Sequence, residues 1–250
     1  MPRYDFRAQR LFVEAPLESG SELTLESGQA HYLLGVLRMK PGDALIVFNG
    51  LDGEWRALVA EVAKRRCTLR LAEQLRPQPS GSSLTYAFAP LKSARLDYLV
   101  QKAVEMGAGR LQPVITRRTQ ISRLNVERLR ANMIEAAEQC GILAIPALLP
   151  EMSLAALVER HRAAETGALI FCDEDQHVGD PLAALELAEG RPLTLLIGPE
   201  GGFDEDERAA LLTLPRIVRL SLGPRILRAD TAGVAALALV QARLGDWARR

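Results

Sequence analysis

The chain has 250 residues, enough for one large domain or two modest ones. It is 48% hydrophobic and 25% charged, a globular balance that excludes a disordered chain, a fibre and a coiled coil. Its 31 basic and 31 acidic residues cancel, which argues against a protein that coats nucleic acid by bulk charge alone.

The compartment is also constrained by the sequence. The longest nearly uncharged apolar run, 232–240, is about half as long as a bilayer span, so we expect no membrane segment. The N-terminal residues lack the apolar stretch of a signal peptide. Cys67, Cys140 and Cys172 are far apart and odd in number, which disfavours a disulfide framework and favours the cytoplasm.

The first 75 residues have the pattern of short strands with one helix inserted. Turn signals such as Pro41-Gly42-Asp43 and Asn49-Gly50 separate apolar or alternating runs. We expect a short helix over 31–38 and strands over 11–13, 22–25, 44–48, 54–63 and 67–71. This pattern predicts a small β-barrel-like domain over 1–75.

Residues 76–83, with the sequence RPQPSGSS, have the composition of a linker. Strands then alternate with helices, and several strands are apolar on both faces. This predicts a parallel α/β sheet covered on both sides over 84–250. The expected strands are 84–89, 111–115, 168–172, 193–197 and 217–222, and the expected helices are 94–106, 125–140, 154–162, 182–188, 204–212 and 231–247.

Ligands of such sheets bind beyond the carboxyl ends of the strands, here the loops after Cys172, Ile197 and Leu222. The second loop, Gly198-Pro199-Glu200-Gly201-Gly202-Phe203, lets the main chain approach a ligand closely. It lacks the Lys-Ser/Thr of a phosphate-binding loop, and Asp204 with Glu207 forms a capping-box-like pair at the next helix. The loop therefore suits a neutral or cationic ligand, although a plain strand-to-helix turn explains it equally well.

The third loop follows the strand that ends at Leu220-Ser221-Leu222, and Gly223-Pro224 turns the chain. Arg225 and Arg228 are three residues apart and suited to a phosphodiester, although ordinary surface arginines are an equal alternative. Asp230 or Thr231 is expected to cap the final helix.

These motifs together resemble the RsmE family of 16S rRNA (uracil-N3)-methyltransferases, which belongs to the SPOUT superfamily. The resemblance is carried by GPEGGF at 198–203 and LSLGPRILRADTA at 220–232, and it extends to HYLLGVLR at 31–38, KAVEMG at 102–107 and AAEQCG at 136–141. The family usually has arginine after that last glycine, whereas this chain has Ile142, which removes any role of that arginine here.

The resemblance implies a PUA-like RNA-binding domain over 1–75 and a SPOUT domain with a C-terminal trefoil knot over 84–250. It implies S-adenosylmethionine (SAM) as cofactor, no metal, a homodimer, and methylation of N3 of a uridine in 16S rRNA of the 30S subunit. The expected cofactor-binding residues are Ile197, Gly198, Pro199, Glu200, Gly201, Gly202, Leu220, Ser221, Leu222, Gly223, Ile226 and Leu227.

Methylation of uracil N3 requires that a proton leave, so a base or a cationic stabiliser is needed. Arg228 and Arg225 are the candidates for holding RNA or the uracil anion, and Glu200 and Asp230 are weaker candidates for the base. The further RNA-binding candidates are Arg7, Arg10, Arg38, Lys102 and Arg117. Three alternatives remain: a SPOUT methylase acting on tRNA, a non-catalytic RNA-binding protein, and an α/β protein that binds a small molecule or a nucleotide.

Overall fold

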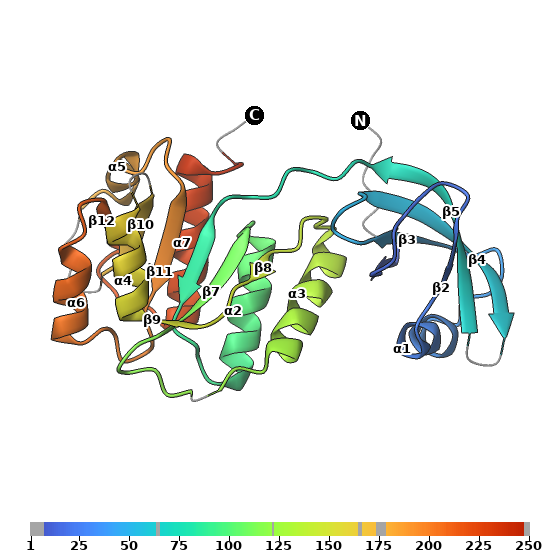
Figure 1. Cartoon of the computed structure of the whole chain (residues 1–250), viewed down its shortest axis with the longest axis horizontal. Coiled ribbons are helices and arrows are strands. Elements are labelled where there is room, and N and C mark those ends of the chain that lie inside the picture. The colour runs from blue at the N-terminus through green and yellow to red at the C-terminus, as the bar shows by residue number, and fades with distance from the viewer. Residues whose placement is uncertain (1–7, 64–65, 122, 165–166, 174–178, 248–250) are drawn as a thin grey trace. The chain divides into compact units, whose positions relative to one another are not determined.

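The computed structural model describes residues 8–63, 66–121, 123–164, 167–173 and 179–247. The chain divides into two compact units (Figure 1). One consists of Met1–Ser80 with Ala137–Ile145, and the other of Gly81–Ala136 with Pro146–Arg250. A short segment distant in sequence therefore completes the N-terminal unit.

The N-terminal unit is built on a five-stranded sheet of order β1-β3-β4-β5-β2. β1 runs parallel to β3, and the other pairs are antiparallel. Alternation along β4 and β5 directs Ala57, Val59, Leu69 and Leu71 into one buried core. The strands are β1 (Arg10–Phe12), β2 (Glu22–Thr24), β3 (Ala44–Phe48), β4 (Glu54–Ala63) and β5 (Arg66–Arg76).

The inserted helix begins and ends earlier than its pattern predicted. An α-helix, α1 (Ser27–His31), passes into a π-helical turn, η1 (Tyr32–Val36), and buries Ala30 and Leu33. Arg38 lies beyond both with a φ of 57°, a left-handed conformation that ends the helical run. The helix expected over 31–38 was therefore wrong in its bounds.

The C-terminal unit contains a parallel sheet of order β12-β10-β11-β6-β7-β8, with β9 paired to β7. Its four central strands are largely buried, which explains their apolar composition. The strands are β6 (Thr85–Phe88), β7 (Arg110–Ile115), β8 (Ala147–Leu148), β9 (Met152–Ser153), β10 (Ala168–Cys172), β11 (Leu193–Ile197) and β12 (Ile217–Leu220). The short β8 and β9 were not predicted.

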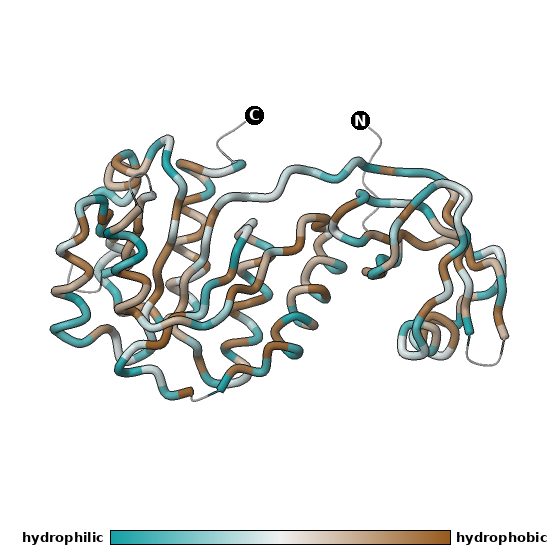
Figure 2. Tube along the Cα trace, viewed as in Figure 1, coloured by the Kyte–Doolittle hydropathy of each residue, from teal (hydrophilic) through white to brown (hydrophobic). Residues whose placement is uncertain are grey.

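Helices cover both faces of this sheet. α4 (Leu154–Ala163) and α6 (Glu205–Leu212) pack against one face, in a core with Ala87, Phe171 and Leu196. On the other side, α7 (Ala229–Leu244) contacts α2 (Ser93–Glu105), α5 (Pro181–Glu186) and β11. The helices carry both hydrophobic and hydrophilic segments along their lengths (Figure 2), as expected for elements with one buried side. α3 (Val126–Cys140) is tied to α2 through Asp97, which accepts hydrogen bonds from Arg128 and Asn132.

The start of α7 corrects one expectation. The helix begins at Ala229 with Arg228 as its N-cap, and no side chain caps it. Asp230 therefore lies within the first turn, where its carboxylate accepts a hydrogen bond from the backbone N–H of Thr231. Its negative charge also interacts favourably with the positive end of the helix dipole.

Candidate active site

A cavity of about 600 Å³ lies at the carboxyl ends of the central strands. Three loops form it: the residues after β10, the glycine loop after β11, and the segment between β12 and α7. Neighbouring parallel strands end at one edge, so loops separated by 25 to 50 residues in the chain converge there. The volume is that of a typical small-molecule site.

The glycine loop forms one wall. Its backbone passes so close to Phe203 that a Cβ on Gly198 would lie 2.7 Å from the ring. Gly202 adopts a φ of 69°, which favours glycine. The predicted capping box then starts α6: the carboxylate of Asp204 accepts from the N–H of Glu207, whose side chain accepts from the N–H of Asp204.

The segment from Leu220 to Arg228 forms the opposite wall. Its turn requires Gly223, at a φ of 92°. Leu220 and Ser221 are buried, whereas Ile226 is 96% exposed although it borders the cavity. This wall is therefore buried at the end of β12 and exposed to solvent near Ile226.

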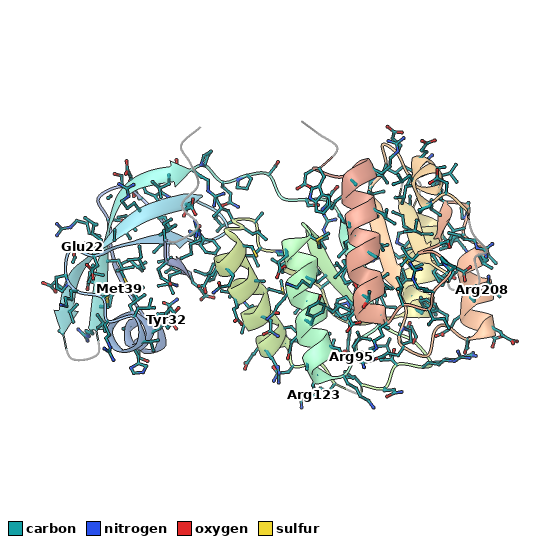
Figure 3. The ribbon with its side chains drawn as sticks, turned by 180° about the vertical axis from the view of Figure 1, so that it is seen from behind. Glu22, Tyr32, Met39, Arg95, Arg123 and Arg208 are labelled. Atoms are coloured by element: carbon teal, nitrogen blue, oxygen red, sulfur yellow. The ribbon has the colours of Figure 1, made fainter. Side chains whose placement is uncertain are left out.

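Charged side chains around the cavity fall into two groups. Asp173 is buried and accepts from both Arg208 and Arg219, and Arg95 donates to Glu200 at 3.2 Å. Figure 3 shows Arg95 on the N-terminal part of α2 and Arg208 on α6.

The other two guanidiniums, those of Arg225 and Arg228, are exposed and have no hydrogen bond or ion pair to any residue that the structure describes. They are the cations at this site that remain available to a ligand.

Burial perturbs a thiol at the base of the site. The cavity is lined by Cys172, and loss of solvent raises the pKa of this thiol to about 12. Cys172 is therefore a protonated, weakly nucleophilic wall residue at neutral pH.

The structure brings the predicted catalytic and cofactor-binding residues together, with Gly201 and Asp230 as the exceptions. Arg228, Arg225 and Glu200 border the cavity, as do all the predicted cofactor-binding residues except Gly201. The carbonyl of Gly201 accepts from Arg118 at 2.5 Å, and a Cβ there would meet that arginine rather than the cavity.

Several cavity residues escaped the sequence analysis. Arg95 follows β6, whose carboxyl end lies at the same sheet edge, whereas the sequence prediction was confined to the loops after β10, β11 and β12. Arg208 lies on α6, and no local pattern indicates that it pairs with Asp173. The lining also includes Phe171, Phe203, Pro224, Ala229 and Ala232.

The predicted RNA-binding residues outside the cavity are differently placed. Arg10 is a correction: it is 4% exposed and paired with Glu54, so it belongs to the core of the N-terminal unit rather than to an RNA-facing surface. Lys102 pairs with Glu105, and Arg117 pairs with Asp204 and Asp206. Arg38 is exposed, and Arg7 lies outside the described residues.

The described residues hold neither a membrane-spanning helix nor a cluster of metal-ligating side chains. No helix there has both the length and the apolar composition to cross a membrane. Nor do three or more His, Cys, Asp or Glu side chains come together there as a metal site.

Comparison with known proteins matches both parts of the chain. Residues 78–241 match the RNA methyltransferase domain family, and residues 25–72 match the RNA methyltransferase PUA domain. Ribosomal RNA small subunit methyltransferase E of Rickettsia conorii is 32% identical over 234 residues, covering 93% of this chain and 94% of the relative. The Synechocystis protein of that name is also 32% identical, over 95% of this chain and 78% of the relative.

Two solved structures of methyltransferases share the fold of this chain over nearly its whole length. The structure of ribosomal RNA small subunit methyltransferase E from Neisseria gonorrhoeae, bound to SAM, has a TM-score of 0.80 at 26% identity, over 95% of this chain and 98% of the other. A Legionella pneumophila protein described as a methyltransferase, with bound SAM, also has a TM-score of 0.80, at 29% identity over 96% and 99%. The expected PUA-like domain and SPOUT-type parallel sheet are confirmed, and the knot stays a prediction. From its sequence, its two domains and its fold, this chain belongs to the ribosomal RNA small subunit methyltransferase E family.

Proposed function

We propose that this protein transfers the methyl group of SAM to N3 of a uridine in 16S rRNA. The observation that carries the proposal is the cavity itself: a cleft walled by a glycine loop, with Arg225 and Arg228 on its rim and unpaired among the described residues. A small cofactor and a nucleobase can thus meet at one place.

The residues present fit SAM. The walls offer close backbone approach at Gly198 and Gly223, apolar side chains at Ile197, Leu220 and Leu222, and a carboxylate, Glu200, on the lining. Bound SAM would supply a methyl group made electrophilic by its sulfonium charge. We assign its binding to the glycine loop and to residues 220–223, 226 and 227, which surround a volume suited to a small molecule.

Residues that line the cavity can remove the uracil proton and stabilise the resulting negative charge. N3 becomes nucleophilic when its proton leaves, and Glu200 is the candidate to accept that proton. The negative charge that spreads to the uracil oxygens is best stabilised by a fixed cation, for which Arg228 and Arg225 are the candidates. Positioning of the base against the cofactor supplies much of the remaining rate.

The wider setting belongs to the same proposal. The proposal includes an RNA-binding domain over 1–75, a linker over 76–83 and a methyltransferase domain over 84–250. We extend the proposal to the 30S subunit or its 16S rRNA as substrate, to a homodimer and to the cytoplasm. The family membership supports the ribosomal RNA substrate. The resemblance of the sequence to the RsmE family motivates the homodimer, and the scattered cysteines motivate the cytoplasm.

The decisive experiment maps 16S rRNA by mass spectrometry in a strain lacking the gene. We expect one uridine to lose a methyl group and to regain it when the purified protein and SAM are added. A missing methyl group on tRNA instead would favour the tRNA-methylase alternative. Failure to bind SAM in a calorimetric titration would favour the non-catalytic alternative.

Arg228 provides the residue-level test. We expect Arg228→Ala to lower the single-turnover methylation rate by about 10²- to 10³-fold, the usual cost of losing one charge stabiliser, while SAM affinity stays within about twofold. Arg243→Ala is the matched control, since Arg243 lies on α7 and pairs with Glu186 outside the cavity lining. Full turnover by Arg228→Ala would contradict the assignment.

A further inference from the structure

An ion pair joins Arg95 to Glu200 across two elements of the cavity. Apart from the Asp173 cluster, it is the one such pair among the described residues that line the cavity. Arg95 comes from the first turn of α2, and Glu200 from the glycine loop after β11. β6 and β11 are neighbouring parallel strands, so the segments that follow them meet. The pair therefore lies between two walls of the site rather than within one.

The pair is exposed enough to exchange partners. The side chains of Arg95 and Glu200 are 42% and 35% exposed, and a single bond of 3.2 Å joins them. Asp173, at the same cavity, is 1% exposed and held by two arginines. Solvated pairs of the first kind contribute little stability and are easily replaced.

A phosphate is a better partner for Arg95 than the carboxylate that it holds. A guanidinium can donate two parallel hydrogen bonds to a phosphate or a carboxylate, but in this pair Arg95 donates only one bond to Glu200, so a well-oriented phosphate would gain a second. Glu200, the candidate base, is thus paired with Arg95, a cation that the phosphates of an RNA backbone would attract. The cavity rim adds Arg225 and Arg228, both exposed, to the same substrate-facing side.

We propose that Arg95 is a binding site for an RNA backbone phosphate, and that the phosphate displaces Glu200 from Arg95 when the substrate binds. The displaced carboxylate then becomes available to take the N3 proton. N3 forms its bond to the methyl carbon as the carbon–sulfur bond of SAM breaks, and the electron pair of that bond stays on sulfur. The proton passes from Glu200 to water afterwards. This inference rests on the proposed function and adds to it the coupling of RNA binding to release of the base.

The test is a double-mutant cycle on RNA affinity, which does not require turnover. Deproteinised 16S rRNA from the deletion strain is titrated with the wild-type protein, Arg95→Gln, Glu200→Gln and the double variant, each saturated with S-adenosylhomocysteine. We expect Arg95→Gln to weaken binding by about 10- to 100-fold, the usual range for a hydrogen bond to a charged group. We expect Glu200→Gln to tighten it about threefold, because the competitor is gone.

The cycle decides between competition and simple repulsion. In the Arg95→Gln background, Glu200→Gln should change affinity by less than about 1.5-fold, because nothing remains to be competed for. An undiminished threefold gain in that background would show general repulsion of RNA by Glu200 and overturn the inference. Arg128→Gln is the control. Arg128, on α3, pairs with Asp97, which lies on the same helix as Arg95, but Arg128 does not line the cavity.

A kinetic arm completes the experiment. Arg95→Gln should raise KM for RNA while kcat falls by less than about threefold, because Glu200 is then free without displacement. A large loss of kcat with unchanged KM would instead make Arg95 a residue of the chemical step and contradict the phosphate assignment. If the wild-type protein bound neither the deproteinised 16S rRNA nor 30S subunits from the same strain, the proposed function would fail. Additive affinities would remove this inference alone.

Discussion

Single glycines decide how closely neighbouring side chains pack against the backbone of this site. Gly198 and Gly201 lie in the same loop, yet only the first borders the cavity. A methyl group on Gly198 would meet the Phe203 ring at 2.7 Å, and that ring packs edge-to-face on Phe171. A methyl group on Gly201 would meet only the side chain of Arg118, at 3.4 Å.

This contrast gives a matched prediction for cofactor binding. We expect Gly198→Ala to weaken SAM binding about tenfold or more, because Phe203 must move and the wall with it. Gly201→Ala should change SAM affinity by less than about threefold, since a flexible side chain can move aside. Calorimetric titration of both variants, with folding checked by circular dichroism, measures the difference. Equal losses in the two variants would show that the whole loop, rather than the wall at Gly198, determines binding.

At the scale of elements, the packing of α7 on the sheet depends on one close approach. Gly233 faces the hydroxyl group of Tyr86 on β6, and a Cβ at this position would lie 2.3 Å from that oxygen. The hydroxyl is buried without a hydrogen-bond partner among the described residues, and burial raises the pKa of Tyr86 far above its ordinary value. The contact therefore combines tight packing with an unsatisfied polar atom.

The two positions should be coupled in stability. We expect Gly233→Ala to lower the free energy of unfolding by about 1–3 kcal/mol through overpacking. Tyr86→Phe should be neutral or stabilising by about 1 kcal/mol, because it removes a buried unpaired hydroxyl. Urea denaturation of the double variant should recover much of the alanine's cost, since the nearest ring carbon is 3.3 Å from the new Cβ. Purely additive effects would show that the hydroxyl is not the obstacle.

For the whole molecule, the N-terminal unit requires a segment from far along the chain. The backbone N–H of Phe12 donates to Glu138, and Arg76 donates to the carbonyl of Gly141. Arg76 also binds Glu54, the buried carboxylate that pairs with Arg10. Residues 137–145 thus satisfy polar groups of strands that precede them by more than 60 residues.

A fragment of residues 1–80 should therefore be less stable than the same unit in the full chain. We expect its urea midpoint to lie well below that of the intact protein, because Arg76 and Phe12 lose their partners. Circular dichroism and tryptophan fluorescence, which reports Trp55 in the fragment, follow the transition. Adding a peptide of residues 126–145 in trans provides the control, and a fragment as stable as the intact unit would contradict the prediction.

The sequence alone determined the strands β6, β7, β10, β11 and β12 and the helices α2 to α7, because buried parallel strands are short apolar runs between amphipathic helices. It did not indicate the two-residue strands β8 and β9. It also indicated the glycine loop, the capping box at Asp204 and Glu207, and the two free arginines, because each is carried by neighbouring residues. Bounds were missed where local signals are weak, as at α1, η1 and the start of α7.

Only the tertiary structure decided which residues distant in the chain pair with one another. Arg95 with Glu200, Asp173 with Arg208, Arg10 with Glu54 and residues 137–145 with the N-terminal strands are pairs separated by 35 or more positions in the chain. Side-chain type shows that a charge needs a partner, but the order of strands in a sheet determines which partner is near. For that reason the sequence located the site, and the fold decided which of its charges are paired and which face a substrate.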